Sequence, residues 1–172
     1  MPNRDLEQYC DEQVQRLVRE VGIPRPFVLS TFLDQFAQWR GRRIELWPFD
    51  HIPRGMCGLW LGFPDHDVIA YSRATPLHSE HIILHEVGHM LCNHKGTASV
   101  GDDLVRLLPN LNPALISKVL GRTSYSDIEE QEAELIATLI AKKAAGGRPR
   151  SRPASTPGLT PELDRLRSTF EE

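Results

Sequence analysis

The chain has 172 residues, of which 40% are hydrophobic and 25% charged, a balance typical of one globular domain with a sizeable core. Its formal net charge of −3 provides no overall basic field for binding nucleic acid. No apolar run approaches the roughly 20 residues that a membrane helix needs, the first residues lack a signal-peptide pattern, and the three scattered cysteines do not indicate a disulfide framework. We therefore expect a cytoplasmic protein with free thiols and no membrane partner.

The first part of the chain is expected to form two helices and then three short strands. A hydrophobic stripe predicts a helix over residues 5 to 21, and a second stripe predicts a helix that begins near Leu29 and ends at Gly41. The stripe of the first helix consists of Leu6, Cys10, Val14, Leu17, Val18 and Val21. The period then changes to that of strands in RRIELW, CGLWLGF and DVIAYS, and the last two are spaced as a hairpin.

Further helices are expected after the strands. Thr75 and Pro76 have the residue types of an N-cap and a first-turn proline, and they predict a helix to about residue 94. Residues 98 to 125 predict one or two short helices. The segment SDIE has the pattern of a capping box and begins a helix over residues 126 to 144.

The end of the chain differs in composition from the rest. Residues 146 to 172 are expected to form a linker rich in Pro, Gly and Arg followed by a short charged helix. The sequence therefore predicts an α+β fold, in which residues 1 to 145 form a mainly helical single domain that includes a small three-stranded sheet.

The segment HEVGH in the helix predicted to begin at Pro76 carries residues suited to metal chemistry. His85 and His89 are four apart, so on a helix their side chains lie on one face and can bind one Zn²⁺. Glu86 lies beside the open side of such a metal, where it can take a proton from bound water. This HExxH arrangement supplies both ligands and a base; the alternative is a chance match, expected in on the order of one such chain in a hundred.

A zinc site built on HExxH usually takes a third protein ligand. The inward stripe expected for the last helix of the domain consists of Ile128, Leu135, Ile136, Leu139 and Ile140. Glu132 falls on that stripe, where an unpaired carboxylate would cost free energy, so it should have a cation. The capping box accounts for Glu129, and Glu130 and Glu134 fall on the polar side. Glu132 is therefore the expected third ligand, the alternative being a pair with an arginine at the edge of the core.

Four other residues near the motif have open roles. His81 precedes His85 by one turn and is either a fourth ligand or a partly buried neighbour. His94 is expected at the surface or at the helix cap. Cys92 is expected in the core, the alternative being a thiolate that binds zinc as an inhibitory switch. Tyr125 could reach the position that stabilises an oxyanion.

The segment HEVGHMLCNH, followed about forty residues later by EEQEAELIATLI, resembles the ImmA/IrrE family of small zinc metallopeptidases. The resemblance covers roughly residues 28 to 145 and implies a small three-stranded sheet packed beside the HExxH helix. It also implies zinc held by His85, His89 and Glu132, with Glu86 as the general base. Family members cleave, or cause cleavage of, helix-turn-helix transcriptional repressors, so such a repressor is the expected partner. The chain has EAELIA where the family usually has E-A-N-x-F-A, a difference around the ligand.

Two functions follow from these residues. The first is an intracellular zinc metalloendopeptidase of the gluzincin type, in which Zn²⁺ lowers the pKa of its bound water to about 7 and Glu86 removes the proton. The alternative is a metal-binding regulatory or toxin–antitoxin-like interaction module with little or no turnover. The intact Glu86 favours the enzyme, and a structural zinc site would normally have four protein ligands, usually including cysteines.

Overall fold

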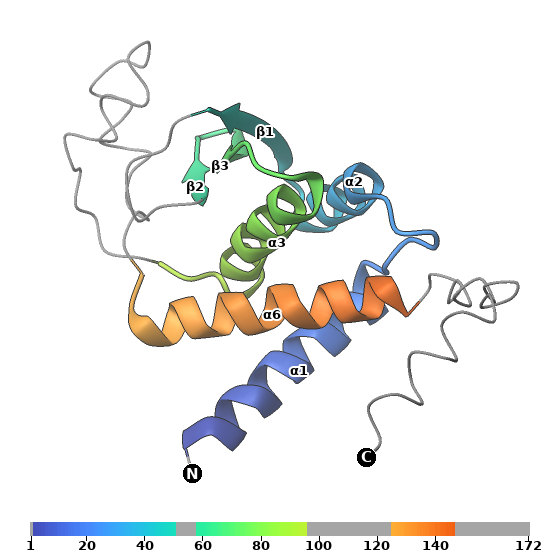
Figure 1. Cartoon of the computed structure of the whole chain (residues 1–172), viewed down its shortest axis with the longest axis vertical. Coiled ribbons are helices and arrows are strands. Elements are labelled where there is room, and N and C mark those ends of the chain that lie inside the picture. The colour runs from blue at the N-terminus through green and yellow to red at the C-terminus, as the bar shows by residue number, and fades with distance from the viewer. Residues whose placement is uncertain (1, 51–57, 96–124, 147–172) are drawn as a thin grey trace, which may run out of the picture.

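The computed structural model describes residues 2–50, 58–95 and 125–146, and the fold is described for these ranges. In chain order the elements are α1 (Pro2–Glu20), α2 (Leu29–Arg40), β1 (Arg43–Phe49), β2 (Gly58–Gly62), β3 (His66–Ser72), α3 (Pro76–Cys92) and α6 (Asp127–Ala145) (Figure 1). The α+β class is confirmed: a small sheet lies within a mainly helical single domain. The short helices predicted over residues 98 to 125 and the predicted linker and terminal helix fall almost wholly outside the described residues.

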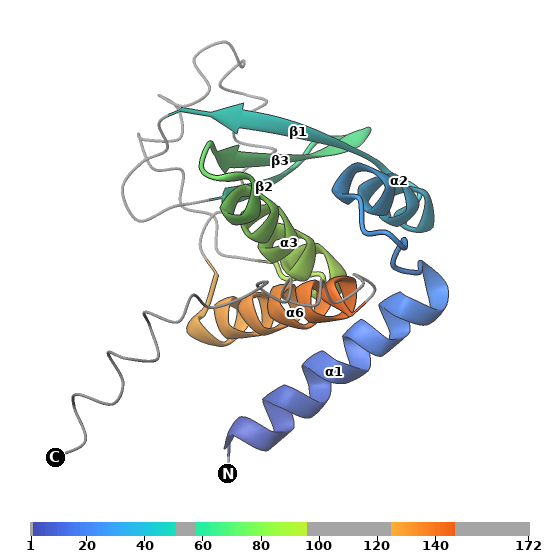
Figure 2. The ribbon, with the colours of Figure 1, turned by 45° about the vertical axis from the view of Figure 1, so that its right-hand side comes forward.

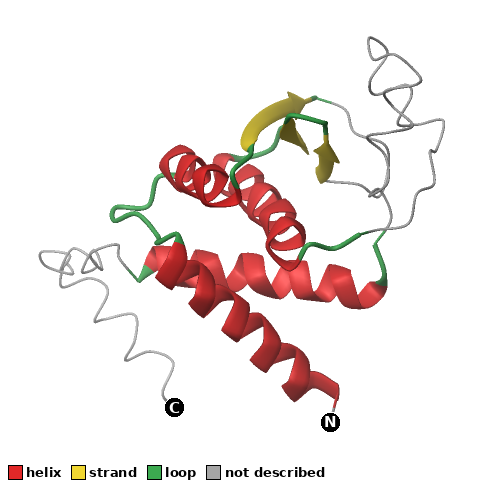
Figure 3. Ribbon diagram, turned by 180° about the vertical axis from the view of Figure 1, so that it is seen from behind, coloured by secondary structure: helices red, strands yellow, loops and turns green. Residues whose placement is uncertain are grey.

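The elements are stacked in layers, with α3 in the middle. The sheet covers one side of α3, α6 packs across the other side, and α1 packs against α6 (Figures 1 and 2). The helices gather on one side of the sheet (Figure 3). Because α3 is enclosed by the sheet and α6, every residue from Glu86 to Leu91 is buried. Among the described residues, no helix is long and apolar enough to cross a membrane.

The sheet contains the predicted hairpin. Its strand order is β1-β3-β2, with β1 parallel and β2 antiparallel to the central strand β3. In the hairpin, Gly58 lies opposite Tyr71 and Gly62 opposite Asp67. Pro48 lies within β1, a position compatible with an edge strand because proline has no N–H for a second neighbour. β2 is the other edge of the described sheet, and it is the edge strand that packs on α3.

The core joins all the layers. It includes Phe32 and Phe36 of α2, Trp60 of β2, Val87 of α3 and Ile136 of α6. The stripe predicted for α1 is confirmed at its centre but wrong at one position: Val18 is 39% exposed. The reason is that α1 packs chiefly against α6, which leaves the side of α1 that carries Val18 in contact with solvent.

A buried carboxylate fixes α2 to the sheet and to the end of α3. Asp67 of β3 is 1% exposed and pairs with Arg40 at 3.4 Å and with Arg42 at 3.1 Å. Arg40 also donates through Nη1 to the carbonyl oxygen of Met90 at 2.8 Å. Truncating Asp67 would remove the buried carboxylate that both guanidinium groups share. These contacts hold the C-terminal turn of α3, which carries His89, in one position.

Candidate metal centre

Local signals place α3 and its last turn. Thr75 accepts a hydrogen bond from the backbone N–H of His78, and Pro76 is the first residue of the helix, as predicted. The helix ends at Cys92, because Asn93 adopts the left-handed conformation with φ of 52°. The chain then turns back, and the N–H of His94 donates to the carbonyl oxygen of His89 at 3.0 Å.

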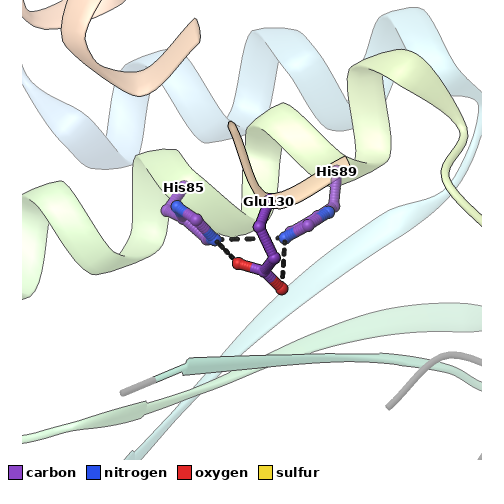
Figure 4. A group of neighbouring side chains, drawn as sticks. All are labelled: His85, His89 and Glu130. Atoms are coloured by element: carbon purple, nitrogen blue, oxygen red, sulfur yellow. Dashed lines mark hydrogen bonds and ion pairs between the residues drawn. The ribbon is translucent and has the colours of Figure 1, made fainter. Parts of the chain in front are cut away.

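Two histidines of α3 and one glutamate of α6 converge on a common point (Figure 4). His85 Nε2 and His89 Nε2 lie 3.1 Å apart. Glu130 places Oε2 at 3.2 Å from His85 Nε2 and Oε1 at 3.8 Å from His89 Nε2. Atoms bound to one tetrahedral Zn²⁺ at about 2.0–2.2 Å are separated by roughly 3.2–3.6 Å, so the three side chains have the spacing of a ligand set.

The third ligand predicted from the sequence is not in this group. Glu132 instead contacts His94, with Oε2 at 2.7 Å from Nε2, and it groups with Cys92. Residues 130 and 132 lie about 200° apart around a helix, so they face opposite sides. In the structure it is therefore Glu130, and not Glu132, that groups with the two histidines, and the ligand role of either glutamate stays a prediction.

The difference follows from the orientation of α6. The hydrophobic pattern predicts Ile128 on the inward stripe, and this position is wrong, because Ile128 is 64% exposed. The buried residues of α6 are Ala133, Ile136, Ala137, Ile140 and Ala144. The small residues among them mark the face that approaches α3, and Gly88 lies directly against the backbone of Ala133. The sequence contains small residues on both helices, Gly88 and Ala133, and such residues indicate the faces at which two helices approach closely. With this face of α6 inward, Glu130 lies on the side of the histidines.

Glu86 lies against β2. Its side chain is 4% exposed, and Gly58 is so close that an added Cβ would be 2.6 Å from Oε1. The backbone of Trp60 donates a hydrogen bond to the carboxylate, but Oε2 has no hydrogen-bond partner among the described residues. A buried polar atom without a partner is costly. A water held beside the three candidate ligands would satisfy Oε2, so the residues present fit a metal centre with a neighbouring base.

Burial and charge set the protonation of the three central groups. Burial raises the pKa of Glu86 to about 8, although the neighbouring His85 opposes this change. Burial, together with His85 and His94, lowers the pKa of His89 to about 2, so this imidazole is neutral, as a metal ligand must be. Burial lowers the pKa of His85, but Glu130 and Glu86 outweigh it and leave the pKa above its usual value. Metal binding at pH 6 would therefore release a proton from His85.

The remaining predicted residues surround this group. Tyr125 stacks its ring on that of His89, with centroids 3.6 Å apart and planes 13° apart. His81 contacts Glu134 at 3.0 Å and is not grouped with the candidate ligands. His94, expected at the surface or the helix cap, is 6% exposed, because the turn at Asn93 directs it back against His89. The expectation of a surface position for His94 is therefore wrong.

Solvent reaches the candidate centre from the side of α1. A hollow of about 540 Å³ opens beside His85 and Glu130 and is also lined by Leu6 and Leu135. A metal site needs such an entry path.

Replacing Glu130 by glutamine is expected to weaken zinc binding, because a candidate ligand is removed. Loss of a residue that only hydrogen-bonds to a ligand lowers metal affinity roughly 10–100-fold, and E130Q should lower it by more than this. The matched control is Glu129→Gln on the same helix. Glu129 belongs to the confirmed capping box with Ser126, where glutamine is also accepted. Competition with a chromophoric chelator measures both affinities. Equal affinities for E130Q and the wild type would contradict the assignment.

Comparison of the chain with protein-family models, with curated proteins and with solved structures finds no match in any of the three. The likeness to the ImmA/IrrE family accordingly stays a resemblance carried by the motif residues and their spacing.

Proposed function

We propose that this protein is an intracellular zinc-dependent endopeptidase. The observation that carries the proposal is the convergence of His85, His89 and Glu130 next to the buried and incompletely satisfied carboxylate of Glu86. Two histidines and one glutamate are the ligand set of hydrolytic zinc sites that keep one position open for water or substrate. A purely structural site would be closed by a fourth protein ligand, and the described residues group none with these three.

Each residue has a defined task in this proposal. His85, His89 and Glu130 would hold the metal, which when bound would act as a Lewis acid that activates water and polarises a carbonyl. Glu86 takes the proton from the attacking water and returns it to the leaving amine. A nearby cation favours the charged form of a carboxyl group, so the high pKa of Glu86 in the metal-free protein would fall on loading. Glu86 would then be ionised and able to accept a proton at neutral pH.

The sheet supports a peptide as substrate. β2 is an edge of the described sheet, and Glu86 contacts its residues Gly58 and Trp60. An extended peptide that pairs with such an edge is held by main-chain hydrogen bonds and passes beside the base. The resemblance to the ImmA/IrrE family suggests the identity of this partner, a helix-turn-helix repressor that presents one extended segment.

The alternative is a metal-binding regulatory module without turnover, such as one partner of a toxin–antitoxin-like pair. Glu86 discriminates between the two functions. A module that only binds has no use for a buried carboxylate with one unsatisfied oxygen, which destabilises the fold. The hydrolytic function gives this carboxylate a role that offsets its cost to the fold.

Selective cleavage is the expected result of a direct assay. The zinc-loaded protein should cut the helix-turn-helix repressor encoded beside its own gene at one bond, and should release little from casein. The reason is that a peptide paired with the β2 edge is held by main-chain hydrogen bonds, which do not depend on its side chains, so selectivity must come from a folded partner. Mass spectrometry of the products identifies the bond.

Two outcomes would contradict selective cleavage. Digestion of casein at many bonds would show a broad protease. A stable complex with the repressor, formed with zinc present and without any fragment, would favour the regulatory module.

A further inference from the structure

We infer that His94 and Glu132 are positioning residues that orient His89 as a metal ligand through a chain of two hydrogen bonds. The inference rests on the proposed metal centre, because it assigns a role toward the group that this centre would bind. It also accounts for two residues that the ligand set leaves unexplained, a buried histidine just beyond the motif helix and a glutamate on the flank of α6 away from Glu130.

The chain of contacts is continuous and largely removed from solvent. His89 Nδ1 lies 2.8 Å from His94 Nδ1, and His94 Nε2 lies 2.7 Å from Glu132 Oε2. The side chains of His89, His94 and Glu132 are 1%, 6% and 17% exposed. The polar atoms of both histidines thus have neighbours within the protein, and each contact has the length of a good hydrogen bond.

The positions of the protons follow from these contacts. A neutral imidazole carries one proton, so His89 must carry it on Nδ1 if Nε2 is to bind a metal. His89 Nδ1–H then donates to His94 Nδ1, which must be the unprotonated nitrogen of its ring. The proton of His94 is consequently on Nε2, where it donates to the carboxylate of Glu132. The opposite order would place the proton of His89 on Nε2 and block the metal.

His85, the other histidine among the candidate ligands, has a similar outer contact that consists of one hydrogen bond. His85 Nδ1 lies 3.4 Å from Glu134 Oε2. Outer hydrogen bonds of this kind fix the tautomer and the ring orientation of histidine ligands. α6 therefore supplies Glu130 toward the metal position, Glu134 behind His85 and, through His94, Glu132 behind His89. Three acidic residues at alternate positions of one helix are explained by one site.

A second metal site at Cys92, His94 and Glu132 is the competing interpretation, since their ligand atoms lie within 4.8 Å of one another. The contacts favour the relay. The hydroxyl group of Tyr9 donates to the sulfur of Cys92, so this sulfur already has a hydrogen-bond partner. Glu132 already accepts from His94, and His94 from His89.

Long-range ¹H–¹⁵N NMR of the histidine rings tests the chain without any assay of activity. In both the metal-free and the zinc-loaded protein, the expected protonated nitrogens are Nδ1 of His89 and Nε2 of His94. A spectrum of the zinc-loaded protein in which His94 carries its only ring proton on Nδ1 would overturn the inference, even if zinc binds as proposed.

Zinc affinity gives the second test, with chelator competition as the readout. His94→Leu and Glu132→Ala are expected to weaken binding about 10–100-fold while one zinc per chain is retained. His94→Asn should recover part of the loss, because its side-chain oxygen can accept from His89 Nδ1–H. Asp127→Asn, an exposed carboxylate on the same helix, is the matched control and should bind like the wild type.

These measurements separate the inference from the proposed function. A wild-type protein that binds no zinc would defeat the proposed metal centre. One bound zinc with unchanged affinity in H94L and E132A would leave the centre standing and overturn the relay. Two bound zinc ions, one of which is lost in Cys92→Ser and in E132A, would replace the relay by a second metal site.

Discussion

Glu86→Gln is expected to abolish hydrolysis while increasing the stability of the metal-free protein. The first effect follows because glutamine cannot accept the proton from the attacking water. The second follows because the carboxylate is 4% exposed with one oxygen unsatisfied among the described residues, so its ionisation in the fold is costly. A substitution that removes activity and increases the stability of the protein indicates a residue that is needed for function but destabilises the fold.

The stability gain should depend on pH in a defined direction. Burial raises the pKa of Glu86 from 4.5 to about 8 in the fold. Below pH 4.5 the group is protonated in both states and costs nothing. As pH rises from 4.5 to 8, the unfolded state loses its proton first, so the free energy of unfolding falls. The total change is at most on the order of 5 kcal/mol, and E86Q should remove it.

Urea denaturation of the metal-free proteins at pH 5 and pH 8 measures this difference. E86Q should exceed the wild type by a few kcal/mol at pH 8 and by much less at pH 5. Glu80→Gln, a substitution on the same helix at a residue that is not buried, is the matched control and should show no such gain. If E86Q retains wild-type cleavage, or is less stable at pH 8, the position assigned to this base is wrong.

Gly88→Ala is expected to be among the most damaging small substitutions in the chain. An added Cβ would lie 2.9 Å from both Cα and the carbonyl oxygen of Ala133, and these are backbone atoms that cannot rotate away. Overpacking of this kind typically costs about 1–3 kcal/mol, which exceeds the gain of about 0.5–1 kcal/mol from replacing a helical glycine. α6 would have to move away from α3.

The displacement should also reach the metal centre. Glu130 lies one turn before Ala133 on α6, so moving this helix separates Glu130 from His85 and His89. G88A is therefore expected to lower both the melting temperature and the zinc affinity. Gly41→Ala is the control: its φ of 67° makes alanine unfavourable, but no atom lies within 4 Å of the added Cβ. It should lose stability only. Wild-type stability and zinc affinity in G88A would contradict the helix crossing described here.

Much of the local structure could be predicted because it depends on short-range chemistry. Thr75 with Pro76 and Ser126 with Glu129 fix the starts of α3 and α6, and all four act within one turn of chain. The spacing of His85 and His89 places both on one face of a helix whatever surrounds it. These features needed no knowledge of the tertiary fold.

The third candidate ligand could not be predicted from local signals, because it depends on how α6 is rotated against α3. The hydrophobic pattern of α6 allowed Ile128 to be counted as inward, whereas the close approach at Gly88 selects the face with Ala133. The burial of His94 depends on the left-handed turn at Asn93, which returns the chain to His89. Both features are set by tertiary packing between segments distant in sequence.

The most direct test of the account is a crystal structure of the zinc-loaded protein with anomalous diffraction recorded at the zinc absorption edge. We expect one strong peak per chain, within about 2.0–2.2 Å of His85 Nε2, His89 Nε2 and a carboxylate oxygen of Glu130, with a non-protein ligand completing the site on the side of Glu86. A peak bound by Glu132 in place of Glu130, or no zinc bound to the two histidines, would contradict the proposed centre.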